Sequence, residues 1–228
     1  MTISERIANV QQLIDKTKRR HHCQQPITLL AVSKKASNSA IKEAFSAGIH
    51  DFGESYLQEA LSKIEALSQL PVRWHFIGPI QSNKAKKIAC HFDWVHSVSR
   101  FDIAKRLSDA RPPSMPPLNI CLQVNMDNEE SKSGVAAEDV QELAASILPL
   151  PRLHLRGLLL IPKYRDDEEQ QYLSFLRLSN LLNTLNQHLS LPLDTLSMGM
   201  SQDMCGAIRA GSTIVRIGTA IFGKRDNN

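Results

Sequence analysis

Short apolar runs alternate with amphipathic segments along almost the whole chain. The apolar runs predict strands at residues 27–32, 50–53, 72–77, 92–96, 118–124, 153–161, 195–197 and 213–217. Apolar residues spaced three or four apart predict helices at residues 38–47, 55–70, 82–89, 100–110, 136–148, 167–189 and 202–210. One further amphipathic helix precedes the first strand, with Ile3, Ile7 and Val10 on its apolar face.

This alternation predicts an α/β fold with a parallel sheet, because strands that are apolar on both faces are covered by helices on both sides. Eight strand–helix units predict a closed (β/α)8 TIM barrel with an extra N-terminal helix. An open doubly wound sheet is the alternative, since the shortest predicted strands leave the strand count open. We expect residues 1–228 to form a single domain, because the only linker-like stretch, 111–117, is too short to separate two.

Two helix starts carry polar signals. Ser99 and Asp102 have the spacing of a capping box before the helix at 100–110. Ser201 is expected to be the N-cap of the helix at 202–210, so that its hydroxyl and the following N–H groups would face an anion.

Composition narrows the class of protein. The formal net charge of +4 is too small to predict nucleic-acid binding without a clustered patch. The four cysteines are far apart and form no C-x-x-C pair, which predicts free thiols in the cytoplasm. No signal segment or membrane span is expected, because the N-terminal segment is amphipathic and no apolar run reaches about 18 residues. Asp127, Glu129 and Glu130 lack a second set of ligands, so we predict no metal site.

Lys34 is the first candidate for chemistry. It follows the apolar run 27–32, where its side chain can reach the mouth of a barrel. An amine in that position can condense with an aldehyde. On this segment alone, a lysine that ends a strand and points to water is the more common case.

The last two strands supply the other candidates. Ser201, Gly218 and Thr219 follow strands seven and eight, where barrels often bind phosphate. Arg216 interrupts the apolar run 213–217, and a charge there is costly without a partner. The partner is either a group inside the barrel, in a salt bridge, or a heteroatom of a ligand.

These candidates combine an amine, two turns that can bind a phosphate, and a hydrogen-bond donor between them. Pyridoxal 5′-phosphate (PLP) has a matching aldehyde, phosphate and pyridine nitrogen. The alternative is an aldolase in which Lys34 attacks a sugar phosphate directly.

At these residues the chain resembles the pyridoxal phosphate homeostasis protein family, which consists of alanine racemase-like PLP-binding barrels of PLP fold type III. The similar motifs occur in order at residues 30–34, 75–78, 81–84, 132–134, 197–203 and 211–219, and together they span nearly the whole chain. The resemblance implies a role in intracellular PLP (vitamin B6) homeostasis, with PLP held covalently on Lys34 as a Schiff base. It also implies that Ser201, Gly218 and Thr219 hold the phosphate and that Arg216 faces the pyridine nitrogen.

One position departs from the family pattern. The family usually has asparagine where this chain has Ser55, and that side chain is expected near the cofactor. Serine is shorter, so a contact would be lost or bridged by water, and we expect weaker binding of PLP without its loss.

Two features argue against robust catalysis. An arginine at the pyridine nitrogen keeps that nitrogen unprotonated, whereas carbanion chemistry usually prefers a carboxylate partner. The racemases of this group also have a second domain that supplies an opposing tyrosine from a partner subunit, and we expect none here because Arg216 is close to residue 228. We therefore predict a monomeric PLP carrier that buffers the cofactor or delivers it by transient contact with PLP-dependent apo-enzymes. The alternative is a minimal amino-acid racemase with Lys34 as its single base.

Overall fold

The strands of the structure form one parallel sheet that closes on itself. The computed structural model describes residues 1–127, 129, 133–163 and 165–223. Within these ranges the strands are β1 (Thr28–Val32), β2 (Asp51–Glu54), β3 (Arg73–Phe76), β4 (Trp94–Val98), β5 (Leu118–Asn125), β6 (Val135–Ala136), β7 (Leu153–Leu160), β8 (Thr195–Ser197) and β9 (Ile214–Ile217). Neighbours follow the order β4-β3-β2-β1-β9-β8-β7-β5, and a further β4–β5 pairing closes the ring. The predicted eight-stranded barrel is confirmed, and β6 is an additional short strand beside β5.

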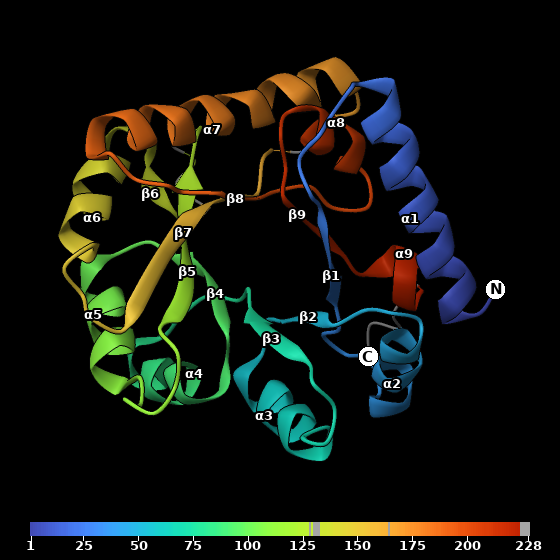
Figure 1. Cartoon of the computed structure of the whole chain (residues 1–228), viewed down its shortest axis with the longest axis horizontal. Helices are drawn as coiled ribbons and strands as arrows, with labels where there is room; N and C mark the ends of the chain where they lie inside the picture. Colours follow the sequence, from blue (N-terminus) through green and yellow to red (C-terminus); the bar gives the residue numbers. More distant parts are fainter. Residues whose placement is uncertain (128, 130–132, 164, 224–228) are drawn as a thin grey trace.

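Helices surround this barrel (Figure 1). They are α1 (Ile3–Arg20), α2 (Asn38–Ser46), α3 (Leu57–Ala66), α4 (Ala85–His91), α5 (Phe101–Ala110), α6 (Val140–Ile147), α7 (Glu168–Leu189), α8 (Met204–Arg209) and α9 (Thr219–Phe222), with 3-10 turns η1 (Ser82–Lys84) and η2 (Ala137–Asp139). The predicted extra N-terminal helix is α1, which begins with a capping box between Thr2 and Glu5 and packs against α2, α8 and α9.

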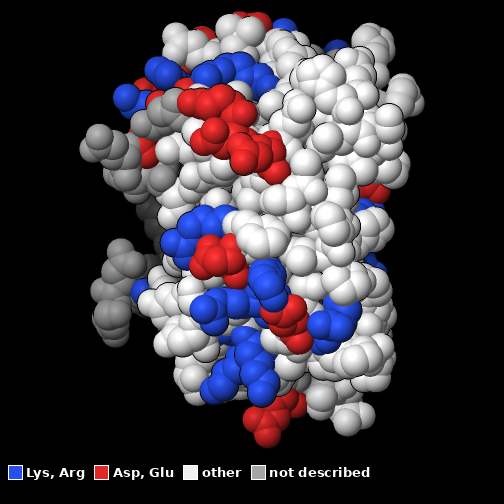
Figure 2. All heavy atoms as spheres, turned by 90° about the vertical axis from the view of Figure 1, so that its left-hand side faces the viewer, with Lys and Arg blue, Asp and Glu red and all other residues white. Residues whose placement is uncertain are grey.

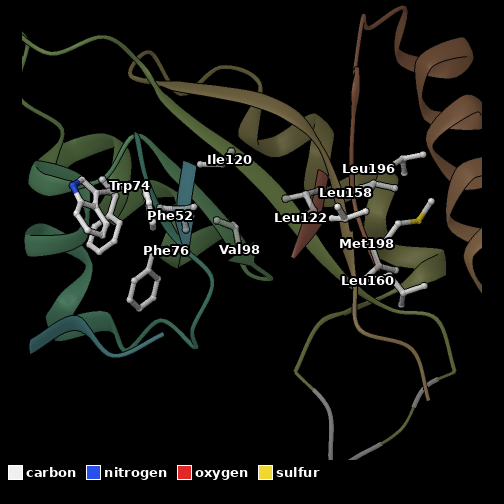
Figure 3. Close-up of a cluster of buried hydrophobic side chains, with 14 of the residues drawn as sticks. Phe52, Trp74, Phe76, Val98, Ile120, Leu122, Leu158, Leu160, Leu196 and Met198 are labelled. Atoms are coloured by element: carbon white, nitrogen blue, oxygen red, sulfur yellow. The ribbon is translucent and has the colours of Figure 1, made fainter. Parts of the chain in front are cut away.

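The main apolar core lies between the barrel and its helices. Side chains alternate along a strand, so every second residue points outward. Figure 3 shows Phe52, Trp74 and Phe76 grouped on β2 and β3, and the Phe52 and Trp74 rings are 6.0 Å apart. On the other side of the barrel, Leu158 and Leu196 belong to a second group on β7 and β8. The apolar periodicity of the sequence therefore records the outer surface of the barrel.

The inward positions are more polar. Asp51, His75, His96, Ser197 and Arg216 are all buried, and hydrogen bonds join them across the barrel interior. Buried polar groups are costly unless they are paired, so this interior has a fixed arrangement of donors and acceptors.

Several local predictions are wrong. Helix α5 begins after Arg100 without a side-chain cap, so Ser99 and Asp102 do not form a capping box; Asp102 instead lies 3.3 Å from Arg100. The predicted helices at 82–89 and 136–148 each begin as a 3-10 turn, so their α-helical parts start only at Ala85 and Val140. The short elements β6 and α9 are not predicted, because two to four residues are too few to show a period.

The surface on the side of α5 and α6 carries basic and acidic side chains interspersed (Figure 2). Such a mixed face lacks the single-sign stripe that is typical of nucleic-acid binding. Among the described residues, no helix combines the length and apolar character needed to cross a membrane.

Candidate functional site

A cavity of about 700 Å³ opens where the strands of the barrel end. Its size falls in the range of about 300–1,000 Å³ that is usual for small-molecule sites. All six residues predicted from the sequence line it: Lys34, Ser55, Ser201, Arg216, Gly218 and Thr219. The apolar part of the lining includes Val32, Ile77, Leu159 and Ile161. The fold thus gathers into one site predicted residues as far apart in the chain as Lys34 and Thr219.

Lys34 lies in a tight turn two residues beyond β1, half-buried in the wall of the cavity. The residues on both sides of it are held. Ser33 is fully buried and donates its hydroxyl to Glu54 Oε1 at 2.6 Å, and the N–H of Lys35 donates to Glu59 Oε1 at 2.5 Å. Lys35 has a φ of 60°, so the backbone reverses directly after Lys34. This turn fixes where the Lys34 side chain leaves the backbone.

A buried ion cluster supports that turn from below. Lys63 of α3 donates to the Ser33 carbonyl oxygen at 2.7 Å, to Glu54 Oε1 at 2.8 Å and to Glu59 Oε1 at 2.5 Å. Burial raises the pKa of Glu54, and the hydrogen bonds from Lys63 and Ser33 oppose that rise. Among the described residues, Glu54 Oε2 has no hydrogen-bond partner. The carboxyl of Glu54 therefore depends strongly on Lys63.

Ser55 follows β2 and is placed by a close backbone contact. A Cβ on Gly78 would lie 2.1 Å from the Ser55 carbonyl oxygen, so only glycine lets the loop after β3 approach this closely. Ser97 holds the same loop by donating its hydroxyl to the Gly78 carbonyl oxygen at 2.5 Å. The position of Ser55 is thus set by backbone packing and not by its own side chain.

Two turns at the cavity present free donors. In the described part of the chain, the backbone N–H groups of Ser201, Gln202, Thr219 and Ala220 donate to no protein acceptor, and all four residues line the cavity. The hydroxyls of Ser201 and Thr219 add two further donors. Unpaired N–H and hydroxyl groups that line one cavity are donors of the kind that bind anions.

The prediction that Ser201 is a helix N-cap is wrong. Helix α8 begins at Met204, and Asp203 occupies the N-cap position without a side-chain cap bond to the helix. The Asp203 carboxylate instead accepts the Met200 N–H at 2.6 Å, which closes a turn containing Ser201 and Gln202. Burial raises the pKa of Asp203, and the Met200 hydrogen bond opposes this. The turn after β8 thus leaves the Ser201 N–H without a protein acceptor, although its geometry is not that of an N-cap.

Arg216 is held by oxygen atoms of the barrel itself. Its Nη1 donates to the Ser197 carbonyl oxygen at 2.5 Å and to Ser197 Oγ at 3.0 Å, and its Nη2 donates to the Leu160 carbonyl oxygen at 3.0 Å. Burial lowers its pKa to about 10, and the nearby Asp203 charge opposes this, so the guanidinium stays protonated at neutral pH. The predicted alternative of a salt bridge inside the barrel is wrong, because the described partners are neutral oxygens. A guanidinium has five N–H groups, which leaves donors for a ligand.

Three contributors to the site were not predicted individually. Ser197 supplies two of the three acceptors for Arg216, and Gln202 and Ala220 each add a free N–H at the cavity. Ser197 has a sequence signal, a small polar residue at an inward strand position, but Gln202 acts through its backbone and has none. Among the described residues, no group of three His, Cys, Asp or Glu side chains could hold a metal ion. Two predicted positions lie outside the described residues. They are Glu130 of the acidic group for which no metal site is predicted, and Lys132 of the family motif at 132–134.

The sequence of this chain is similar to those of known proteins. The family described as alanine racemase, N-terminal domain matches residues 8–226. The pyridoxal phosphate homeostasis protein of Pseudomonas aeruginosa is 57% identical over 200 residues, which are 88% of this chain and 85% of the relative. The protein of that name from Escherichia coli is 50% identical over 206 residues, 88% of this chain and 86% of the relative.

Solved structures show the same fold. PipY of Synechococcus elongatus, known without PLP and with PLP bound, is 34% identical, with TM-scores of 0.86 and 0.85. In both cases the match covers 97% of this chain and 100% of PipY. Alanine racemase of Corynebacterium glutamicum has a TM-score of 0.68 at 16% identity, over 97% of this chain and 62% of the racemase, which shows a shared fold alone.

Proposed function

The chain belongs to the alanine racemase N-terminal domain family and to the pyridoxal phosphate homeostasis proteins, and on that basis we propose that it binds PLP and acts in PLP homeostasis. One observation carries the proposal: an amine, an anion cradle and a protonated guanidinium line the same cavity. Relatives of this chain are named pyridoxal phosphate homeostasis protein, and the structure of PipY has been solved with PLP bound.

The residues present fit the chemistry of PLP. The unpaired N–H groups at Ser201, Gln202, Thr219 and Ala220 suit a phosphate, which accepts several hydrogen bonds at once. Apolar side chains such as Val32 and Leu159 suit the face of a ring. PLP supplies an aldehyde that bonds covalently to an amine and a ring that can take up electron density. In this site Lys34 is the residue proposed to hold it covalently.

The remaining residues would position the cofactor. Arg216 would donate to the pyridine nitrogen, and its three barrel acceptors keep the guanidinium in one orientation. A nitrogen that accepts from a protonated arginine carries no proton of its own, which weakens the ring as an electron sink. Ser55 also lines the cavity and would lie near the cofactor, where the family usually has the longer asparagine. These arrangements favour storage of PLP over catalysis.

We further propose that the chain works as a single-domain monomer in the cytoplasm and passes PLP to apo-enzymes by transient contact. All four cysteines are free, which suits a reducing compartment. A minimal racemase is the alternative, supported by the family match and by a lysine in the cavity. Incubation of the PLP-loaded protein with D- and L-alanine separates the two, because a racemase would interconvert them at a rate set by protein concentration.

The experiment that tests the binding proposal compares PLP with pyridoxal, which lacks the phosphate. The full chain is titrated with each and followed by absorbance. The cradle predicts a dissociation constant at least about 100-fold lower for PLP, because charge-assisted hydrogen bonds of about 1.5–3 kcal/mol each are absent with pyridoxal. Inorganic phosphate should compete with PLP. Equal affinity for PLP and pyridoxal would contradict the proposed site.

A further inference from the structure

A line of hydrogen bonds crosses the inside of the barrel from β2 to the cavity. Asp51 Oδ1 lies 3.0 Å from His75 Nε2, and His75 Nδ1 lies 2.9 Å from His96 Nε2. His96 Nδ1 lies 2.8 Å from Ser197 Oγ, which in turn accepts from Arg216 Nη1 at 3.0 Å. Asp51 is the first residue of β2, whereas the cavity lies beyond the last residues of the strands. The line therefore connects the two ends of the barrel.

The protonation state of each member follows from its neighbour. Hydrogen bonds from His75 and Arg73 outweigh the effect of burial on Asp51 and lower its pKa to about 2, so Asp51 is an anion that only accepts. His75 Nε2 must then carry the proton. Burial lowers the pKa of His75 and of His96, so each ring has one proton at neutral pH.

Each neutral ring donates at one nitrogen and accepts at the other, so it fixes which group donates in the next hydrogen bond. With its proton on Nε2, His75 accepts at Nδ1, so His96 also carries its proton on Nε2. His96 Nδ1 then accepts the Ser197 hydroxyl proton, and this turns a lone pair of Ser197 Oγ toward Arg216. All four bonds point the same way, from the guanidinium to the carboxylate, and bonds aligned in this way strengthen one another.

The groups have little freedom to adopt another pattern. His75 is 1% exposed, and His96 and Ser197 are fully buried. Trp94 stacks on His75 with ring centroids 5.5 Å apart and an angle of 6° between the rings, which holds the imidazole in one plane. A ring flip or a change of proton position would leave a buried donor without an acceptor, which is costly in this environment.

We propose that Asp51 orients Arg216 for its ligand through His75, His96 and Ser197, which makes the two histidines positioning residues of the site. The ligand itself rests on the proposed function, namely PLP bound with its ring nitrogen at Arg216. Neither histidine lines the cavity, and the hydrogen-bonded route from them to Arg216 runs through Ser197.

The first test is independent of PLP. Long-range 1H–15N NMR spectra of the ligand-free full chain report which ring nitrogen carries the proton. We expect both His75 and His96 as Nε2–H forms from pH 6 to 8. In Asp51→Ala the Nδ1–H form of His75 should appear, whereas Arg73→Ala, which removes the other partner of Asp51, should leave the wild-type forms. An Nδ1–H or doubly protonated ring in the wild type, or unchanged forms in Asp51→Ala, would overturn the proposal.

The second test uses two variants of one residue. The amide of His96→Asn lies near the position of Nδ1 and can still accept the Ser197 hydroxyl, whereas the amide of His96→Gln lies near Nε2 and cannot. We expect the dissociation constant for PLP to rise about tenfold in His96→Gln and less than about threefold in His96→Asn. The absorption maximum of bound PLP should shift only in His96→Gln. Equal weakening in both variants would mean that the imidazole is merely structural and would overturn the proposal.

The two tests separate this inference from the proposed function. If the wild type binds no PLP, the proposed function fails, while the proton positions in the first test still decide whether the line has the stated direction. If the wild type binds PLP but the histidine forms are wrong, the inference fails and the proposed function stands.

Discussion

Replacement of Lys63 by methionine would remove the cation that neutralises the buried carboxyl of Glu54. Lys63 Nζ donates to Glu54, to Glu59 and to the Ser33 carbonyl oxygen, and Glu54 is fully buried. In the variant, Ser33 would be the only described hydrogen-bond donor left to Glu54. Methionine keeps the length and most of the apolar stem of lysine, so the change isolates the loss of charge and hydrogen bonds.

The size of the effect follows from the pKa of Glu54. Loss of one member of a buried ion pair usually costs about 3–5 kcal/mol. The carboxyl can limit the cost by taking up a proton. From the ordinary pKa of 4.5, protonation at pH 7 costs about 3.4 kcal/mol, because each pKa unit is worth about 1.36 kcal/mol. We therefore expect Lys63→Met to lower the free energy of unfolding by about 3–4 kcal/mol at pH 7.

The pH dependence gives the sharper test. In the variant the folded-state pKa of Glu54 lies further above its unfolded value, so the folded state binds a proton that the unfolded state releases. Acid therefore stabilises the variant. Its deficit, which is the amount by which its free energy of unfolding lies below that of the wild type, should shrink by up to about 1.4 kcal/mol per pH unit as the pH falls from 7 to 5. Urea unfolding followed by circular dichroism at pH 5, 6 and 7 measures it.

The matched control is the double variant Glu54→Gln/Lys63→Met, in which the buried group is neutral. It should be more stable than Lys63→Met alone at pH 7 and should lose the pH dependence of the deficit. A deficit of the same size at every pH, and in the double variant, would refute the reasoning that an uncompensated carboxylate is the cause.

Three other outcomes are expected. The pKa of Asp51 is lowered from 3.8 to about 2, so its ionised carboxylate stabilises the folded state by about 2.4 kcal/mol above pH 3.8. This stabilisation is lost as the pH falls through about 2. Urea unfolding from pH 5 to 2 should therefore show a smaller loss of stability in Asp51→Asn than in the wild type. Gly78→Ala places a Cβ against the Ser55 carbonyl oxygen, so it should cost about 1–3 kcal/mol in thermal unfolding and weaken PLP binding, whereas unchanged values would show that the loop yields freely. Ser55→Asn restores the residue usual in the family, and titration should give a dissociation constant for PLP about three- to tenfold lower, as expected for one added hydrogen bond; an unchanged or higher value would exclude a contact at this position.

The fold could be predicted because the outward positions of the strands are apolar, such as Leu118, Ile120 and Leu122 of β5. The β4–β5 pairing that closes the barrel could not be predicted in the same way. The sequence of one strand does not show which distant strand pairs with it. The α-helical starts near 82 and 136 were misplaced because the 3-10 turns there are three residues long, which is too short to show a period in the sequence.

The candidate site shows the same division. Lys34 and Arg216 could be predicted because each is a charge beside an apolar run. The acceptors of Arg216 could not, since two of them are backbone carbonyl oxygens, which every residue has. Lys63 follows the buried Leu57 and Ala60 at helical spacing in α3, but only the folded structure shows that its amine is paired beneath the Lys34 turn. His75 and His96 do carry a signal, a polar residue at an inward position of neighbouring strands.

The most direct test of the central claim is to locate the covalent bond between PLP and the protein. The wild type, Lys34→Ala and Lys35→Ala are incubated with PLP, reduced with borohydride, digested and mapped by mass spectrometry. Lys35 is the matched control because it is the adjacent lysine, is exposed and does not line the cavity. If Lys34 holds PLP, we expect a reduced adduct on Lys34 in the wild type and in Lys35→Ala, with loss of the yellow absorption band in Lys34→Ala. An adduct on another lysine, or a band that survives in Lys34→Ala, would contradict this claim.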